Sequence, residues 1–102
     1  MNYSVRFERD AVDQLAVIED HIASRVGCEI AANFVGNVLH VCNTLSMFPH
    51  RGRGRDDIRA GLRITGYHRR VAIAFTVDDE KLLITIVGVF YGGQDWESRL
   101  SS

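Results

Sequence analysis

The chain has 102 residues, of which 46% are hydrophobic and 25% are charged, and its formal net charge is −1 at pH 7. This length and composition are typical of one soluble globular domain spanning residues 1–102. The sequence holds no run of about 18 apolar residues, which argues against a membrane span, and it opens without the apolar stretch of a signal peptide, so a cytoplasmic location is expected.

The first residues predict a strand followed by an amphipathic helix. Tyr3, Val5 and Phe7 alternate with polar residues, which is the period of a half-buried strand. Asp10 is expected to cap the helix, and Gly27 is expected to end it. The apolar positions of this helix recur at helical spacing: Ala11, Leu15, Ile18 and Ile22.

A second helix is predicted from Cys28 to Met47, closed by Pro49, the only proline of the chain. Its apolar stripe is wide, so it must pack against more than one neighbour. Either both neighbours belong to the chain itself, or part of the stripe accepts another protein. The residues that would accept apolar side chains of a partner are Phe34, Val35, Val38 and Val41.

The two cysteines, Cys28 and Cys42, lie in this one predicted helix. Fourteen residues of helix separate them by about 21 Å, so they cannot form a disulfide with each other, and reduced thiols are expected. Neither has a histidine or a second cysteine at the spacing that a zinc site needs, so no metal site is expected.

The segment 49–70 is strongly basic in an otherwise acidic chain. Residues 51–70 contain seven arginines and two aspartates, a charge of +5, so the remaining residues carry −6. Such a segment needs an anionic partner, either a phosphate backbone or an acidic peptide, or it must be paired within the chain. Glycines interrupt it, and a short strand is predicted over Ile58–Ile64.

Two stronger strands are predicted next, over Arg70–Val77 and Leu82–Phe90, joined by a polar turn at residues 78–81. The second is apolar on both faces, so it should lie inside the sheet. The predicted class is α+β: an N-terminal strand, then an antiparallel helical hairpin packed on one face of a C-terminal, antiparallel three-stranded meander. Residues 94–100 form a short tail that contains Trp96.

A catalytic site is weakly specified. His50, His68 and Tyr91 could supply a general acid and base for RNA cleavage, with arginines holding the phosphate. However, arginine stays charged and cannot act as a base, and the basic segment contains no lysine. Only one aromatic residue, Tyr67, lies between Arg51 and Arg70, which favours a carboxylate-bearing protein partner over single-stranded nucleic acid. We therefore assign no catalytic residue and no cofactor.

Seven motifs, taken in order, resemble a known family. They are Tyr3-Ser-Val-Arg-Phe7, Ala11-x-x-x-Leu15-x-x-Ile18, Ala32-x-Phe34, Phe48-Pro-His-Arg-Gly52, Arg59-Ala-Gly-Leu-Arg63, Arg69-Arg-Val-Ala-Ile-Ala-Phe75 and Val89-Phe-Tyr-Gly-Gly-Gln-Asp-Trp-Glu97. Together they resemble the RelE/ParE superfamily of type II toxin–antitoxin toxins, and in particular the ParE-like branch of plasmid-stabilisation proteins.

The resemblance implies a cognate antitoxin as partner, of the ribbon-helix-helix type, which alone would contact operator DNA. An acidic and apolar segment of this antitoxin would fold along the helices and pair with arginines. The basic residues expected in this contact, beside the four positions of the second helix, are Arg55, Arg59, Arg63, Arg69 and Arg70.

The resemblance also implies an activity. ParE-like toxins inhibit DNA gyrase without being enzymes in their own right, whereas RelE-like relatives cleave mRNA in the ribosome. Because the lysines of the RelE site are absent here, gyrase inhibition comes first and mRNA cleavage is the alternative; a regulatory module without toxicity is a third possibility. The expected target-facing residues are Tyr91, Gln94, Asp95 and Trp96.

Overall fold

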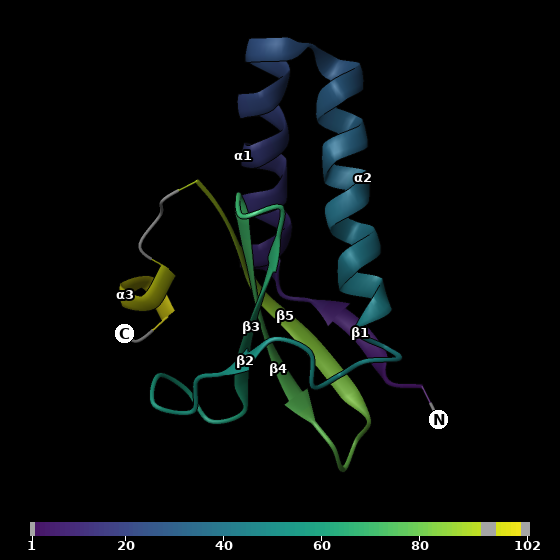
Figure 1. Ribbon diagram of the computed structural model, residues 1–102, viewed down its shortest axis with the longest axis vertical. Helices are drawn as coiled ribbons and strands as arrows, with labels where there is room; N and C mark the ends of the chain where they lie inside the picture. Colours follow the sequence, from purple (N-terminus) through teal and green to yellow (C-terminus); the bar gives the residue numbers. More distant parts are fainter. Residues whose placement is uncertain (1, 93–95, 101–102) are drawn as a thin grey trace.

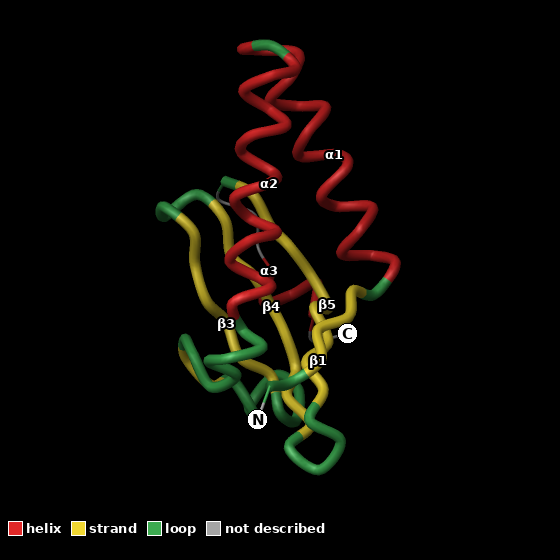
Figure 2. The backbone as a smooth tube through the Cα atoms, turned by 90° about the vertical axis from the view of Figure 1, so that its right-hand side faces the viewer, coloured by secondary structure: helices red, strands yellow, loops and turns green. Residues whose placement is uncertain are grey.

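A computed structural model describes residues 2–92 and 96–100. Its elements are, in chain order, β1 (Ser4–Phe7), α1 (Arg9–Val26), α2 (Cys28–Thr44), β2 (Arg53–Gly54), β3 (Leu62–Tyr67), β4 (Val71–Asp78), β5 (Leu83–Tyr91) and α3 (Trp96–Leu100). The two long helices form an antiparallel hairpin that projects beyond one end of the sheet (Figures 1 and 2). The structure confirms the predicted α+β class.

The sheet has five strands in the order β1-β5-β4-β3-β2. The last three long strands form the predicted antiparallel meander. β1 joins it in parallel beside β5, with Val5 opposite Ile84, so β5 lies inside the sheet as its apolar faces predicted. The two-residue strand β2 extends the other edge, where Arg53 lies opposite Ile64. The sequence did not predict β2.

The first helix buries the four apolar positions that its spacing predicted, and it ends at Val26, before Gly27. Gly27 has φ 102°, a conformation that favours glycine, and it turns the chain directly into α2. The prediction that Asp10 caps α1 is wrong. The N-cap is Glu8, whose backbone carbonyl accepts the first helical bonds, and Asp10 lies inside the first turn. A carboxylate there still interacts favourably with the helix dipole.

Two predicted boundaries in the middle of the chain are also wrong. The second helix ends at Thr44 rather than Met47, so Pro49 lies in the loop beyond it and does not close it. The strand predicted over Ile58–Ile64 begins only at Leu62, as β3, because residues 56–61 form turns and a bend. In these turns, the Asp56 carboxylate accepts the N–H of Gly61 at 2.8 Å, and the Arg55 N–H bonds the carbonyl of Leu62 at 2.8 Å.

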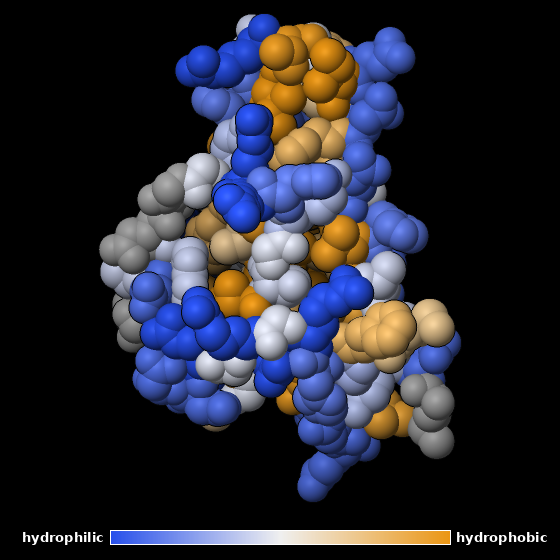
Figure 3. All heavy atoms as spheres, viewed as in Figure 1, coloured by the Kyte–Doolittle hydropathy of each residue, from blue (hydrophilic) through white to orange (hydrophobic). Residues whose placement is uncertain are grey.

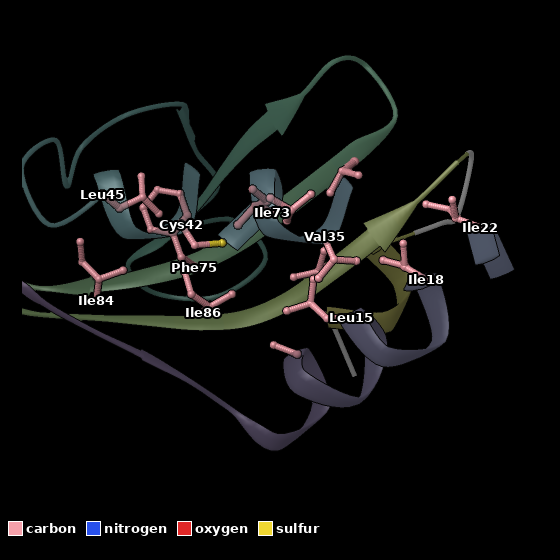
Figure 4. Packing of buried hydrophobic residues seen from close by; sticks show 14 of the residues in the cluster. Leu15, Ile18, Ile22, Val35, Cys42, Leu45, Ile73, Phe75, Ile84 and Ile86 are labelled. Atoms are coloured by element: carbon pink, nitrogen blue, oxygen red, sulfur yellow. The ribbon is translucent and has the colours of Figure 1, made fainter. Parts of the chain in front are cut away.

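The main core lies between the helical hairpin and the sheet. Figure 4 shows Ile73, Phe75 and Ile86 of the strands directed toward side chains of α1 and α2. A smaller apolar cluster covers the opposite face of the sheet; its members are Leu62, Ala74, Val87, Phe90 and Leu100. The hairpin therefore packs on one face, while the other face is covered in part by the C-terminal helix α3.

Both cysteines are free thiols, as expected. Cys28 is exposed at the start of α2, and Cys42 is buried in the main core. Burial raises the pKa of the Cys42 thiol to about 12, so it stays protonated and behaves as a small apolar side chain.

Candidate functional site

A groove of about 570 Å³ lies on the face of the sheet that the hairpin leaves uncovered. Its apolar floor includes Phe90 of the smaller cluster together with Ile64 and Ala72, which pack against that cluster, and Trp96 of α3 adjoins it. Three arginines line it: Arg53 from β2, and Arg69 and Arg70 from the turn between β3 and β4. Figure 3 shows strongly hydrophilic residues around small apolar patches over the sheet-bearing part of the molecule. The site thus combines guanidinium groups with an apolar floor.

The turn that carries Arg69 and Arg70 is strained. His68 has φ 51° and Arg69 has φ 61°, so both central residues have the positive φ typical of a type I′ turn. Such turns favour Asn-Gly, because a side chain in this conformation costs about 1–2 kcal/mol. Two backbone bonds hold the turn: Arg70 N–H to the Tyr67 carbonyl at 3.1 Å, and Gly92 N–H to the Arg70 carbonyl at 2.8 Å. Strain of this kind is found at functional sites.

Arg53 reaches the groove because the chain before it lies very close to β3. Gly52 has φ 81°, and a Cβ added there would collide with the carbonyl of Ile64. Only glycine can occupy this position without moving the backbone. Arg53 is not among the binding residues predicted from the sequence. It lies in the repeat Arg51-Gly-Arg53-Gly-Arg55, and no periodicity distinguishes it from its neighbours.

Arg55 was predicted to contact a partner, but it is already neutralised within the chain. Its guanidinium binds both oxygens of Asp57 and one oxygen of Glu97, each at 2.9 Å. It also lies over the ring of Trp96, with 5.5 Å between its Cζ atom and the ring centroid. Hydrogen bonding by Arg55 lowers the pKa of the Asp57 carboxyl, and the two carboxylates raise the pKa of Arg55. This cluster holds α3 against the arginine-rich loop.

Arg59 and Arg63 are also engaged, but with backbone carbonyls rather than carboxylates. Arg59 donates to the carbonyl of Leu100 at 3.3 Å, and Arg63 donates to carbonyls of the loop before β2. Of the five arginines predicted to bind a partner, Arg69 and Arg70 remain exposed at the groove, and neither forms an ion pair with a carboxylate of the described residues. Arg53 joins them.

The four predicted positions of α2 have different surroundings. Val35 and Val38 are only 8% and 1% exposed and belong to the main core, so they cannot receive a partner's side chains without opening it. This corrects the expectation for these two residues: their side of the stripe packs on the chain itself. Phe34 and Val41 are half-buried. The ring of Phe34 makes edge contacts with Tyr67 and Tyr91 at centroid distances of 5.6 and 5.9 Å.

The predicted target-facing residues do not share one surface. Tyr91 packs against His21 and Phe34 on the hairpin side of the sheet. There it lines a second groove, of about 710 Å³, between α1 and the end of β5. Trp96 lies on the opposite face and is partly buried against the smaller cluster. Gln94 and Asp95 lie outside the described residues.

The three candidates for acid–base chemistry belong to separate contacts. His50 lies 3.2 Å from the carboxylate of Asp79, which also accepts the hydroxyl of Tyr3 at 2.6 Å. These bonds, chiefly that from Tyr3, lower the pKa of Asp79, and the same bond raises the pKa of Tyr3. His68 packs edge-on against Tyr67 at the strained turn. Tyr91 lies in the aromatic contacts already described.

Among residues 2–92 and 96–100, no group of three His, Cys, Asp or Glu side chains is placed to hold a metal ion. The helices in these same ranges are too short or too polar to cross a membrane.

The chain matches one family model. The model, described as the ParE toxin of the type II toxin–antitoxin system parDE, matches residues 5–96. No curated protein matches the chain in sequence.

Several solved structures share the fold. A structure of the chromosomal ParDE toxin–antitoxin system from P. aeruginosa is 24% identical, with a TM-score of 0.75 over 88% of this chain and 96% of that chain. One from the RelBE2 toxin–antitoxin complex of Mycobacterium tuberculosis is 21% identical, with a TM-score of 0.67 over 92% and 95%. A mutant of the E. coli toxin RelE in the free state is 12% identical, with a TM-score of 0.61 over 99% and 95%.

Proposed function

The chain belongs to the ParE toxin family of type II toxin–antitoxin systems, and from this premise we propose that residues 1–102 form a single cytoplasmic toxin domain that inhibits DNA gyrase. A cognate antitoxin, of the ribbon-helix-helix type, keeps the toxin silent. Operator DNA is contacted through the antitoxin alone. The proposal combines the family membership with the properties of the arginine-lined groove.

The groove suits an acidic and apolar segment of the antitoxin. Guanidinium groups form charge-assisted hydrogen bonds with carboxylates, often two at a time, and Arg53, Arg69 and Arg70 are available for them. The floor beneath them is apolar, with Ile64 and Phe90 among its residues, so a partner segment can bury apolar side chains between its charged contacts. A segment that folds only on binding commonly uses both kinds of contact. Phe34 and Val41 are proposed as additional apolar contacts along α2.

One observation carries the choice of a binding role over an enzymatic one. Tyr91, one of the three residues considered for proton transfer, packs on the hairpin side of the sheet, whereas the arginines line the groove on the other face. A phosphate held by the arginines would thus lack this acid or base, and arginine itself cannot deprotonate at neutral pH. We propose Tyr91 and Trp96 as parts of two separate surfaces, either of which can face gyrase.

The alternative is ribosome-dependent mRNA cleavage. It is favoured by one observation, the position of His68 beside Arg69 at the strained turn, where an imidazole and a guanidinium lie in adjacent residues. A histidine can exchange protons near neutral pH. An experiment can distinguish gyrase inhibition from mRNA cleavage.

The experiment compares two assays with the purified toxin. One measures supercoiling of plasmid DNA by gyrase, and the other measures cleavage of mRNA in the presence of ribosomes. The proposal predicts loss of supercoiling, intact mRNA, and recovery of supercoiling when the antitoxin encoded beside the toxin gene is added. Cleaved mRNA together with unaffected gyrase would establish the alternative instead.

A further inference from the structure

The side chain of Arg63 holds the loop that precedes β2. Its Nε donates to the carbonyl of Arg51 at 3.1 Å. Its Nη2 donates to the carbonyl of Gly52 at 3.0 Å and also to the carbonyl of His50. One guanidinium thus binds three consecutive carbonyls, each turned toward the same group. Arg63 itself lies in β3, directly opposite Gly54 of β2.

The three hydrogen bonds from Arg63 tie the loop before β2 to strand β3. Residues 50–52 precede β2, so their carbonyls are not part of the ladder between β2 and β3, which covers only Arg53 and Gly54. Residues 50–52 are exposed, so water would satisfy these carbonyls if Arg63 were absent. The planar fork of N–H donors instead ties all three carbonyls to one side chain. Gly52 permits the close approach, because its φ of 81° and missing Cβ let the chain lie against Ile64.

The N–H groups that Arg63 uses within the chain limit how it can bind a carboxylate of a partner. A guanidinium that already donates from Nε and Nη2 to carbonyls cannot present that same edge to a carboxylate in a bidentate pair. The residue that immediately follows the held loop is Arg53, which lines the groove. Arg63 therefore does not line the groove but holds the loop before it, whereas Arg53 lines the groove directly.

We propose that Arg63 is a positioning residue, which fixes residues 50–52 so that Arg53 is held at the groove for a carboxylate of the antitoxin. The inference rests on the proposed antitoxin-binding function, and it replaces the sequence-based expectation that Arg63 contacts the partner directly. Lysine cannot substitute for it. An ammonium group is a compact point charge without the planar fork that spans neighbouring carbonyls.

The test is a set of double-mutant cycles. The affinity of the purified toxin for the antitoxin encoded beside its gene is measured for Arg53→Gln, Arg63→Gln, Arg69→Gln, and the two doubles that contain Arg63→Gln. Each single change is expected to weaken binding about tenfold, the loss of one charge-assisted contact. Because Arg63 acts through Arg53, the Arg53/Arg63 double should also lose only about tenfold. The Arg63/Arg69 double, whose sites act independently, should lose about a hundredfold.

Two further measurements separate this role from a general effect of charge or stability. Arg63→Lys keeps the charge but lacks the planar fork that binds the three carbonyls, so it should bind the antitoxin as weakly as Arg63→Gln does. In the free toxin, amide hydrogen exchange of residues 50–54 should accelerate in both variants, while that of β4 and β5 stays unchanged. This measurement needs no antitoxin and therefore tests the positioning role by itself.

Three results would overturn the inference: additive losses in the Arg53/Arg63 cycle, wild-type affinity of Arg63→Lys, or unchanged exchange in the loop. Failure of the wild-type toxin to bind the antitoxin would instead contradict the proposed function, and the exchange measurement would still decide whether Arg63 holds the loop.

Discussion

Replacement of Arg69 by glycine should make the free protein more stable while it weakens antitoxin binding. Arg69 has φ 61°, and a side chain in this conformation costs about 1–2 kcal/mol. Glycine removes that cost but loses more entropy on folding, by about 0.5–1 kcal/mol. The difference between the two ranges runs from about 0 to 1.5 kcal/mol and centres near 0.75 kcal/mol, which corresponds to a rise in Tm of about 3–6 °C for a domain of this size.

Arg69→Ala is the matched control, because it removes the same guanidinium but keeps a Cβ at positive φ. The glycine variant should therefore be about 1 kcal/mol more stable than the alanine variant, as measured by thermal and urea unfolding. Both should lose antitoxin affinity equally, about tenfold. Equal stabilities of the two variants would refute the strain at this turn, and wild-type affinity of either would refute the assignment of Arg69 to the groove.

Three other predictions test the fold around the site. Gly52→Ala should lower the free energy of unfolding by about 2–3 kcal/mol, because the added Cβ collides with the Ile64 carbonyl and φ at this position is positive. The control is Gly36→Ala in an open position of α2. It should leave stability unchanged or raise it by up to about 1 kcal/mol. Truncation after Gly92 removes Trp96 and Leu100 from the smaller cluster and should cost at least about 2 kcal/mol in urea unfolding, since a buried leucine alone contributes about that much; unchanged stability would show that α3 is not part of the fold. The pKa of Asp79 is lowered from 3.8 in the folded protein, so its contribution to stability is present above that pH and is lost as the pH falls below it. Asp79→Asn should therefore flatten the decline of Tm between neutral and acid pH, and an identical acid profile would show that the Tyr3–Asp79 bond contributes nothing.

The sequence predicted the elements that depend on local periodicity. Ala11, Leu15 and Ile18 recur at helical spacing and are buried, and β5 lies inside the sheet as its apolar faces required. Boundaries that depend on tertiary contacts were missed. The segment Ile58–Ile64 contains strand-forming residues, but the bond between Asp56 and Gly61 keeps its first part in turns.

The site was predicted only at the level of composition. The excess of arginine indicated an anionic partner. Contacts between residues distant in sequence, however, decide which of the five predicted arginines are engaged within the chain and which line the groove. Arg55 meets Glu97, 42 residues away, and Arg63 meets the carbonyl of His50, 13 residues away. No local pattern encodes such pairs, because they depend on the register of β2 against β3 and on the docking of α3. Arg53 was missed for the same reason.

The most direct test of the account compares two charge reversals in their affinity for the antitoxin. Arg70→Glu places a carboxylate at the groove, whereas Arg25→Glu makes the same change of net charge in the last turn of α1. We predict that Arg70→Glu weakens binding at least a hundredfold at 0.15 M salt, because it removes one attraction and adds one repulsion, and that Arg25→Glu changes it less than threefold. Equal affinities of the two variants would contradict the claim that the arginine-lined groove is where the toxin is neutralised.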